Sequence, residues 1–515
     1  MDKDYEVIVS GGGPTGLMLA CELVLWDVSV LVVERLAEPD LTIKAGAITL
    51  HASEALYRRG YGDQLAEVQY KALARFMPGF KAPVRRENAG GTLPKLPTHF
   101  GGLFKIDATR LDGDDEQFQV HADAVTSVVS QQELERVLGE GAAKLGVEVL
   151  RAVELTGFTQ DDDGVSVRLS DGRSLRAAFL AGCDGGRSTV RKLAGFGFPG
   201  TEPTITGHQA MVELDDPGKL PRGWNRTDVG MLVAGPSPER VLTVEFDGPP
   251  ADRDAPVTAE EIQASLRHVS GTDVTVLKVR TATRFTDNAR QASTYRQGRV
   301  LLAGDAAHVH SPFGGQGLTL GIGDAVNLGW KLAATLRGWA PDGLLDTYTR
   351  ERHPIAAKVL EATRAQVALM RPDPMTSALR DVVSDLMDTE EGNAYFAKLM
   401  SGLGQRYDLG DGDPLVGGRT PDIELADGSW IGDHFADGQA VLFDFAGSPE
   451  VAAAVSGHAG RITLLSLPPK QNRDITALLV RPDGYVAWAS RTSGAVDGLA
   501  EAIGTWFGKA VAAAR

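Results

Sequence analysis

The chain has 515 residues, more than one hydrophobic core usually serves, so we expect two or three domains. Its net charge of −16 argues against nucleic acid or an anionic membrane as a partner. Residues 1–4 leave no room for a signal peptide, no apolar run reaches membrane-spanning length, and the only cysteines, Cys21 and Cys183, form no disulfide framework and no CxxC pair. These features predict a cytoplasmic protein outside the disulfide-reductase class.

Residues 5–35 are typical of a dinucleotide site. An apolar strand at 7–9 leads into a glycine-rich turn, an apolar helical run and a second strand at 28–33. Gly11 would allow the tight turn, Gly13 the approach of a pyrophosphate, and Gly16 close packing of the helix. The phosphates would bind the free N–H groups of the helix N-terminus, and Glu34 would accept hydrogen bonds from the ribose. FAD and NAD use the same turn, so it does not choose between them.

The next segments change in pattern. Lys44 is either a surface lysine or a cation for the pyrophosphate or a second nucleotide. A helix is expected at 50–59, strands and loops at 77–123, and a second helix at 131–145. Further on, strands at 147–155 and 165–169 flank an Asp-Gly turn, which predicts a hairpin.

A second motif begins at Asp184. The apolar strand that starts at Phe179 leads into Asp184-Gly185 and the start of a helix. This order places Asp184 where strand ends converge on a ligand crevice. A turn alone would explain Asp-Gly, but it would not require Ser188 and Arg191 at their offsets.

In residues 201–284, apolar and polar residues alternate over short segments that proline-rich stretches separate. This pattern predicts an inserted antiparallel sheet. Its inward positions include Met211, Trp224, Met231 and Phe246. Each of these is more often a core residue than a substrate contact.

A third motif follows the apolar strand at 300–303. The strand ends at Gly304-Asp305, and a glycine-rich loop at 312–317 precedes a helix that reaches about Leu336. The N-terminus of such a helix stabilises negative charge, which suits a reduced flavin anion. His308 and His310 have no acid or cysteine at ligand spacing, so we expect no metal site.

The tail after a Gly- and Asp-rich boundary at 410–418 has the pattern of a small α/β domain. Strands are expected at 440–445, 462–467, 477–480 and 485–489, followed by a closing helix. Without a cysteine pair, this domain cannot carry out dithiol chemistry.

Together the three motifs resemble the FAD-dependent aromatic hydroxylases, the class A flavoprotein monooxygenases of the para-hydroxybenzoate hydroxylase fold. The resemblance spans the chain to about residue 390. The tail resembles the thioredoxin-like C-terminal domain of the subgroup that acts on aromatic polyketides and rifamycin-type antibiotics. The implied fold class is α/β, with a Rossmann-type FAD-binding domain, an inserted antiparallel-sheet substrate domain and a C-terminal thioredoxin-like domain. The implied segments are 1–76, 124–200 and 284–395 for the FAD-binding domain and its long helices, 77–123 and 201–283 for the substrate domain, and 410–515 for the thioredoxin-like domain.

The resemblance also implies site residues. The cofactor-binding set is Gly11, Gly13, Pro14, Thr15, Gly16, Glu34, Arg35, Lys44, Gln131, Leu155, Asp184, Gly304, Asp305, Pro312, Gly315, Gly317, Leu318 and Thr319. The candidate substrate contacts are Met211, Trp224, Met231, Phe246 and Phe313. Three residues depart from the family pattern, in which Lys44 is commonly arginine, Thr319 asparagine and Gly323 glutamine.

The implied reaction uses FAD, NADPH or NADH as the transient reductant, and O2 as the co-substrate. A C4a-hydroperoxyflavin would transfer one oxygen atom to a polycyclic aromatic substrate of the polyketide type, in secondary metabolism or antibiotic modification. We expect a monomer or homodimer, and the sequence identifies no catalytic base. Four alternatives stay open: a Baeyer–Villiger oxygenase or epoxidase on the same scaffold, a flavin halogenase, a NAD-dependent dehydrogenase without flavin, and a noncatalytic module. The lack of the Trp-x-Trp-x-Ile-Pro pattern disfavours the halogenase.

Overall fold

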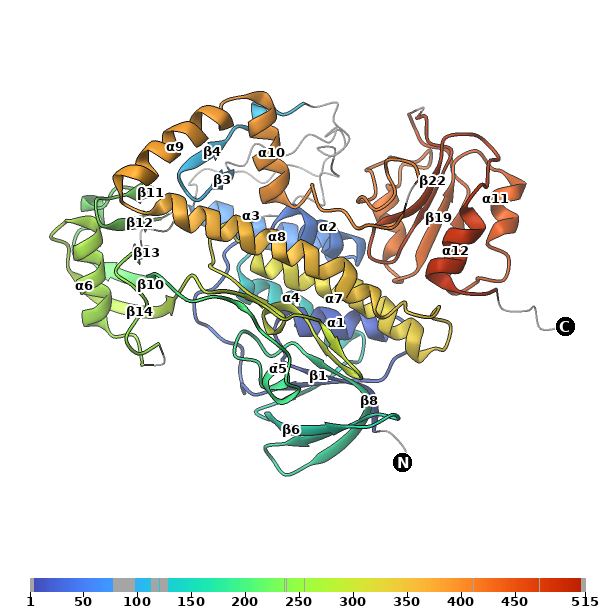
Figure 1. Ribbon diagram of the computed structural model, residues 1–515, viewed down its shortest axis with the longest axis horizontal. Coiled ribbons are helices and arrows are strands. Elements are labelled where there is room, and N and C mark those ends of the chain that lie inside the picture. Colours follow the sequence, from blue (N-terminus) through green and yellow to red (C-terminus); the bar gives the residue numbers. More distant parts are fainter. Residues whose placement is uncertain are drawn as a thin grey trace.

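The computed structural model describes residues 4–76, 98–112, 120, 128–235, 237, 239–253, 255–410, 412–471 and 473–510. A central α/β unit lies between an antiparallel sheet at one end of the molecule and a small C-terminal α/β unit at the other (Figure 1). None of the helices in these ranges is long and apolar enough to cross a membrane.

The central sheet brings the three sequence motifs to one edge. Its order is β16-β17-β8-β1-β2-β5, and every neighbouring pair from β17 to β5 is parallel. The glycine turn follows β1, Glu34 ends β2, Asp184 follows β8, and Gly304 follows β17. Because the carboxyl ends of parallel strands share one edge, the motifs converge there. The strands are β1 (Tyr5–Ser10), β2 (Val30–Glu34), β5 (Glu148–Arg151), β8 (Ser174–Gly182), β16 (Arg296–Gln297) and β17 (Val300–Leu302).

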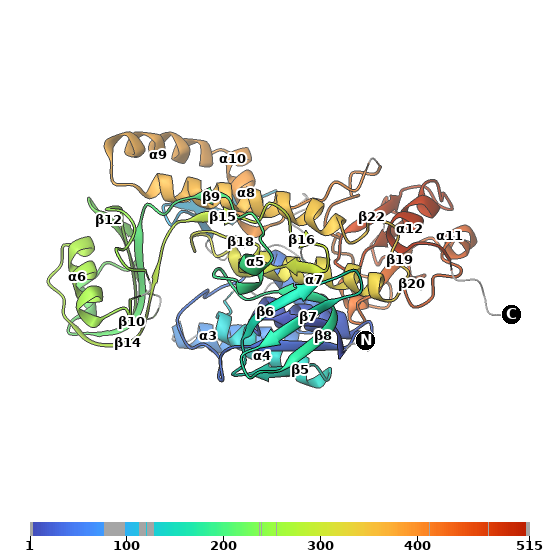
Figure 2. The ribbon, with the colours of Figure 1, turned by 60° about the horizontal axis from the view of Figure 1, so that its bottom comes forward.

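The predicted hairpin extends this sheet from β8, through β7 (Val165–Leu169) and β6 (Leu155–Gln160) (Figure 2). The prediction of a single strand at 147–155 is wrong. It is two strands, because Ala152 has a positive φ of 59° and turns the chain between β5 and β6.

Helices cover the central sheet. Pro14 begins α1 (Pro14–Val24), which packs closely on α7 (Gly317–Leu336) and on α4 (Gln131–Lys144). Every residue of α7 from Thr319 to Ala334 is buried, so this helix lies inside the molecule. The other helices of the central unit are α2 (Leu50–Arg58), α3 (Gly62–Phe76), α5 (Thr189–Leu193) and α8 (Thr347–Met370). The helices expected at 50–59, at 131–145 and up to about Leu336 are confirmed, whereas α3 was not predicted.

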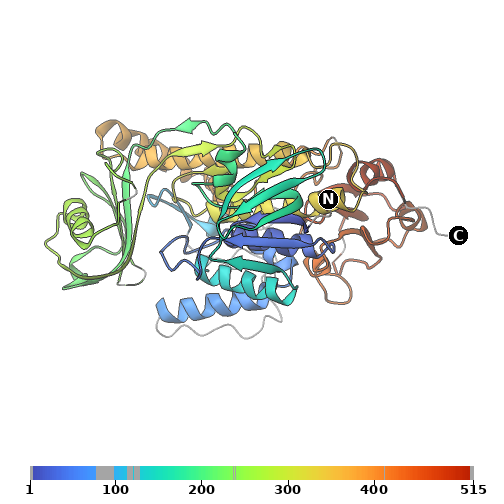
Figure 3. The same cartoon turned by 90° about the horizontal axis from the view of Figure 1, so that it is seen from below.

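The second sheet is antiparallel, as expected, with the order β11-β12-β13-β10-β14. The sequence analysis did not predict the helix α6 (Ala259–Ser270), which covers the outer face of this sheet (Figure 3). The helix had local signals, since the Thr258 side chain caps its N-terminus and Gly271 ends it in the left-handed region. The strands are β10 (Thr206–Leu214), β11 (Gly223–Arg226), β12 (Gly230–Ala234), β13 (Arg240–Glu245) and β14 (Val276–Phe285).

Smaller elements join these parts. A three-stranded sheet links the two large sheets, and a short hairpin lies beside two further helices. Of the strand and loop pattern expected at 77–123, residues 77–97, 113–119 and 121–123 lie outside the described ranges. The elements are β3 (Thr98–Phe100), β4 (Phe104–Ile106), β9 (Gly200–Thr201), β15 (Ala289–Gln291), β18 (His308–Val309), α9 (Pro374–Met387) and α10 (Glu390–Ser401).

The C-terminal unit contains a four-stranded sheet with the order β20-β19-β21-β22. The pair β19 and β20 is parallel, and the other two pairs are antiparallel. All four expected strands and the closing helix are confirmed, with ends that differ by a few residues. The elements are β19 (Ala440–Asp444), α11 (Pro449–Ala454), β20 (Ile462–Leu465), β21 (Ala477–Val480), β22 (Val486–Ser490) and α12 (Leu499–Phe507).

Candidate active site

A cavity of about 1620 Å³ runs from the carboxyl edge of the central sheet to the inner face of the antiparallel sheet. Most cofactor residues expected from the sequence line it, namely Gly11, Gly13, Pro14, Thr15, Glu34, Arg35, Lys44, Gln131, Leu155, Asp184, Asp305, Pro312, Gly315, Gly317 and Leu318. The structure therefore brings together residues that are up to 307 positions apart in the chain.

The glycines of the first turn have different surroundings. Gly11 has a φ of +109°, and a Cβ there would overlap the carbonyl oxygen of Cys183. A Cβ at Gly16 would overlap the carbonyl oxygen of Gly11, so this glycine lets α1 pack against the turn. A Cβ at Gly13, in contrast, would meet nothing within 4 Å. The backbone at Gly13 thus faces open space at the N-terminus of α1, which suits the approach of a phosphate.

Glu34 holds the turn in place. Its Oε2 accepts a hydrogen bond from the Gly12 N–H at 2.7 Å, and its Oε1 accepts one from the Leu36 N–H at 2.8 Å. A carboxylate oxygen accepts more than one hydrogen bond, so both oxygens can also receive ribose hydroxyls from the cavity.

Asp184 orders the second motif. Its Oδ2 accepts hydrogen bonds from the N–H groups of Thr189 and Val190 at 2.7 and 3.0 Å. Its Oδ1 is buried and has no hydrogen-bond partner within the described ranges. Burial raises the pKa of this carboxyl. A buried acceptor without a donor at the wall of a cavity fits a ligand that brings a hydroxyl group.

Arg191 joins the second motif to the third. Its guanidinium donates to the carbonyl oxygens of Ala306 and Gly186, at 2.9 and 2.8 Å. The motifs after β8 and β17 therefore form one rigid wall of the cavity.

Thr15 joins the first motif to the third. Gly304 has a φ of +62°, and a Cβ there would lie 2.8 Å from the Thr15 Oγ1. A Cβ at Gly321 would overlap the same hydroxyl. Gly304 therefore lies behind the cavity wall, and the exposed carboxylate of Asp305 lines the cavity instead.

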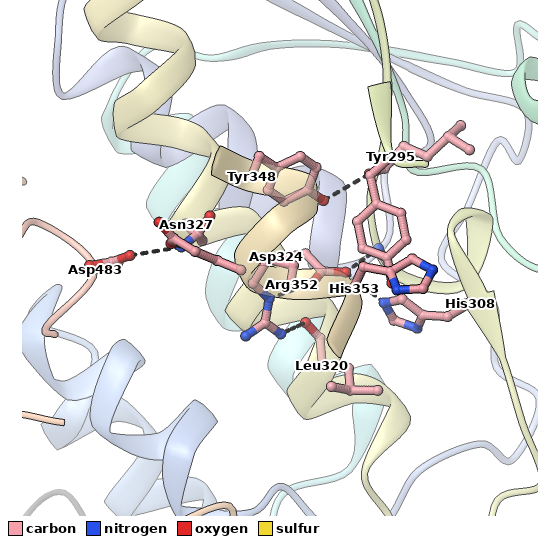
Figure 4. A network of polar contacts seen from close by, with 12 residues as sticks. Tyr295, His308, Leu320, Asp324, Asn327, Tyr348, Arg352, His353 and Asp483 are labelled. Carbon is pink, nitrogen blue, oxygen red and sulfur yellow. Dashed lines mark hydrogen bonds and ion pairs between the residues drawn. The ribbon is translucent and has the colours of Figure 1, made fainter. Parts of the chain in front are cut away.

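Asp324 supports the third motif from inside the protein (Figure 4). This fully buried carboxylate accepts hydrogen bonds from the Gly304 N–H at 3.0 Å, His308 Nε2 at 2.7 Å and Arg352 Nε at 2.7 Å. Burial alone would raise its pKa, but the contacts with His308 and Arg352 hold the pKa below its usual range. His308 is thus part of a buried polar network.

Aromatic rings line the part of the cavity beside the antiparallel sheet. The ring of Phe313 lies edge-on to Trp224 and to Phe285, with centroids 6.2 and 5.9 Å apart. Trp224 also lies 4.9 Å from the ring of His99. Such a surface suits a flat aromatic ligand.

Several expected site residues lie elsewhere. Thr319 is buried, and its hydroxyl accepts hydrogen bonds from the N–H and hydroxyl of Thr49 instead of facing the cavity. Met231 is a fully buried core residue, and Met211 and Phe246 do not line the cavity. Gly16 and Gly304 do not line the cavity. Each allows close packing behind the cavity wall, Gly16 against Gly11 and Gly304 against Thr15. Of the candidate substrate contacts, Trp224 and Phe313 line the cavity.

The sequence reasoning missed further lining residues on the antiparallel sheet. Gln209 faces Leu242 across β10 and β13, and Thr283 faces Gln209 across β14 and β10. Arg240 lies two residues before Leu242, on the same face of β13. Alternation along each strand was visible in the sequence, but which face is turned to the cavity depends on the register between strands.

The residues present fit an FAD molecule. The open backbone at Gly13, the available carboxylate of Glu34, the unpaired Oδ1 of Asp184 and the N-terminus of α7 at Gly317 all border one cavity. Its volume exceeds the usual range for a single small ligand, which is about 300–1,000 Å³. The cavity therefore has room for a dinucleotide and a second molecule.

Comparison with known proteins gives the same assignment. A family model described as "FAD binding domain" matches residues 4–363, and one described as "Aromatic-ring hydroxylase, C-terminal" matches residues 413–510. The chain is 41% identical to the 12-dehydrotetracycline 5-monooxygenase/anhydrotetracycline 6-monooxygenase of Streptomyces rimosus, over 98% of this chain and 99% of that protein. It is 39% identical to the rifampicin monooxygenase of Streptomyces venezuelae, over 99% of this chain and 100% of that protein.

The fold is also that of a solved structure. The OxyS anhydrotetracycline hydroxylase from Streptomyces rimosus superposes with a TM-score of 0.85 at 38% sequence identity. The match covers 98% of this chain and 100% of that chain. It therefore includes the antiparallel sheet and the C-terminal unit.

Proposed function

The chain belongs to the FAD-dependent aromatic-ring hydroxylases, which are flavin monooxygenases, and we propose that its substrate is a polycyclic aromatic compound of the polyketide type. The observation that carries this proposal is the single cavity of about 1620 Å³, which leads from the glycine turn to the rings of Trp224, Phe285 and Phe313. A single-ring phenol would leave much of this aromatic surface exposed to water. The names of the tetracycline- and rifampicin-oxidising relatives support a large substrate.

The enzyme uses FAD, NAD(P)H and O2. Bound FAD supplies the activation of O2 and the transfer of one oxygen atom. The protein must hold the cofactor and the aromatic ring in a fixed relation and exclude water from the reacting atoms. Phe313 is buried, and the half-buried rings of Trp224 and Phe285 lie around it, so this part of the cavity is largely apolar.

Within this proposal the chain's own residues have defined roles. The N–H groups of Gly13 and Thr15 bind the pyrophosphate, and Glu34 binds the adenosine ribose. Asp184 and Asp305 bind the flexible chain of the cofactor, and the residues from Gly315 to Leu318 lie along the flavin ring. Support comes from the positions of these residues at the cavity wall and from the N-terminus of α7, whose dipole favours a reduced, anionic ring.

The C-terminal unit is proposed to be thioredoxin-like and to begin after about residue 410. Its support is the topology, in which β19, α11 and β20 form a parallel unit and β21, β22 and α12 add an antiparallel hairpin and a helix. The proposed division of the rest of the chain follows the two sheets. The central sheet and its helices form the cofactor domain, and the antiparallel sheet with α6 forms the substrate domain.

The test is anaerobic reduction of the yellow, FAD-loaded protein by NADPH, with and without a dihydroxyanthraquinone, followed by exposure to 18O2. Faster reduction with the ligand and one 18O atom in the product support the hydroxylase function. Insertion of 18O next to a carbonyl would indicate Baeyer–Villiger oxidation instead. A protein that stays colourless after addition of FAD would contradict the function at its first step.

A further inference from the structure

Arg240 differs from Arg284 and Arg191, two of the other arginines that line the cavity. Arg284 is held by both carboxylate oxygens of Glu261, and Arg191 by two backbone carbonyls. Arg240 forms no ion pair with any described residue, and its one side-chain hydrogen bond is a long one, 3.4 Å to the Gly235 carbonyl. Burial lowers the pKa of this guanidinium, and no described carboxylate opposes that effect. A largely buried cation without an anion is costly, so the site is suited to an anion from outside the protein.

The position of Arg240 places it at the substrate end of the cavity. Strand β13 alternates, so Val241 and Thr243 face α6, whereas Leu242 and Val244 pack with Phe313 on the opposite face. Arg240 is in phase with Leu242, and both residues line the cavity. The two ends of the cavity are therefore chemically distinct, with the backbone N–H groups of the glycine turn at one and, on the antiparallel sheet, the guanidinium of Arg240 next to Leu242 at the other.

A neutral polar group lies close to Arg240. Gln209 is directly opposite Leu242 on β10, one diagonal step from Arg240, and it lines the cavity too. An amide and a guanidinium on neighbouring strands can donate together to one oxygen atom. The flanking surface is apolar and aromatic, as expected where a few polar groups orient a flat ligand.

We propose that Arg240, assisted by Gln209, binds an ionised phenolic or enolic oxygen of the aromatic substrate. The proposed substrates are thus polycyclic aromatic compounds that carry an acidic hydroxyl group. This hydroxyl group loses its proton to solvent, and the protein binds the resulting anion. This inference rests on the hydroxylase function proposed above. The bound anion is more electron-rich than the neutral phenol, so Arg240 both orients the ring and favours its attack on an electrophilic oxygen.

The test uses FAD-loaded protein and alizarin, a dihydroxyanthraquinone that turns from yellow to red when its first phenolic proton is lost. Difference spectra over a pH series give the pKa of bound alizarin in the wild type, Arg240→Met and Arg240→Lys. In the wild type the bound pKa should lie about one unit or more below that of free alizarin. Arg240→Met should abolish this shift and weaken binding of the anion about tenfold, and Arg240→Lys should retain part of both effects.

Two controls separate charge recognition from packing. Binding of 1,2-dimethoxyanthraquinone, which cannot ionise, should be the same in the wild type and in Arg240→Met. Arg280→Met makes the same substitution on β14, where Arg280 pairs with Glu239 at 2.9 Å and does not line the cavity, and it should behave as the wild type.

The proposal is overturned if the wild type binds no alizarin anion, if Arg240→Met leaves the bound pKa unchanged, or if it weakens the dimethyl ether equally. FAD content and the rate of flavin reduction by NADPH, measured on the same samples, report on the hydroxylase function separately. Normal flavin reduction with an unchanged bound pKa would remove the role of Arg240 and leave that function standing.

Discussion

The backbone N–H of Gly304 donates a hydrogen bond to the buried carboxylate of Asp324, 3.0 Å away. This bond joins the turn that carries Asp305 to α7, in which every residue from Thr319 to Ala334 is buried. Arg352 on α8 binds the other carboxylate oxygen and also donates to the Tyr407 hydroxyl at 3.1 Å. Tyr407 in turn stacks on Tyr485 of the C-terminal unit with ring centroids 3.9 Å apart. The cofactor turn is therefore connected to the C-terminal unit through one buried network.

Asp324→Asn should weaken both the fold and the cofactor site. The change removes the negative charge that balances Arg352, and breaking a buried ion pair costs about 3 kcal/mol. Because the Gly304 turn also loses its anchor, we expect the dissociation constant of FAD to rise about tenfold. Thermal unfolding of the apoprotein and fluorescence titration with FAD measure the two effects.

Glu22→Gln is the matched control for that substitution. Glu22 forms a similarly buried pair with Arg59 at 2.6 Å, and Arg59 also donates to the carbonyl oxygen of Pro482 in the C-terminal unit. This pair lies at the far end of α1 from the glycine turn. Its loss should lower stability by a similar amount while FAD affinity stays unchanged. If both variants lose FAD affinity equally, Asp324 stabilises the fold in general and has no specific role in holding the cofactor turn.

Gly323→Ala should displace Arg352 from Asp324. A Cβ at Gly323 would lie 2.6 Å from the Arg352 Nη2, and the guanidinium is fixed by Asp324, Tyr407 and the Leu320 carbonyl. Overpacking of this kind costs about 1–3 kcal/mol. Calorimetry should show this loss, whereas Gly139→Ala in α4, where a Cβ meets nothing within 4 Å, should stabilise the protein by up to about 1 kcal/mol. A stabilised Gly323→Ala variant would contradict the geometry around Arg352.

Two of the three departures from the family pattern, Gly323 and Thr319, have physical reasons in the structure. Gly323 leaves room for Arg352, and the Thr319 hydroxyl joins α7 to Thr49 at the start of α2. Local patterns predicted the three motifs because each lies within about 20 residues and follows a parallel strand. Neither the role of Asp324, whose network reaches Tyr407, nor that of Arg240, which depends on strand register, has a local signal. Such long-range pairings are visible only once the fold is known.

Two glycines of the first turn should respond differently to the same substitution. Gly13 has a φ of −77° and open space around a Cβ, so Gly13→Ala should leave the stability of the apoprotein within about 0.5 kcal/mol of the wild type. The added methyl group would occupy the place of a phosphate, so we expect FAD affinity to fall at least about tenfold. Gly11→Ala forces a positive φ and overlaps the Cys183 carbonyl, and should destabilise the apoprotein by more than about 2 kcal/mol. Unchanged FAD binding in Gly13→Ala would place the pyrophosphate elsewhere.

The pH dependence of stability should include Asp422, at the junction of α2 and the C-terminal unit. Burial and the nearby Glu54 carboxylate raise the pKa of Asp422 to about 7. Below about pH 3, which is under the ordinary pKa of an aspartate, the group is largely neutral in the folded and unfolded chains alike. Between about pH 4 and 7 the unfolded chain releases a proton that the folded chain keeps, so stability falls as pH rises and then levels off.

Asp422→Asn should therefore stabilise the protein at neutral and higher pH. A shift of about three units corresponds to about 4 kcal/mol, and we expect about 2 kcal/mol because the carboxyl retains some solvent access. The gain should shrink on acidification and vanish below about pH 3, where the wild-type carboxyl is largely neutral in both states. Urea unfolding over a pH series measures this difference, with Asp474→Asn as a control at an exposed position of the same unit. A gain from Asp422→Asn that is the same at every pH would exclude titration of Asp422 as its cause.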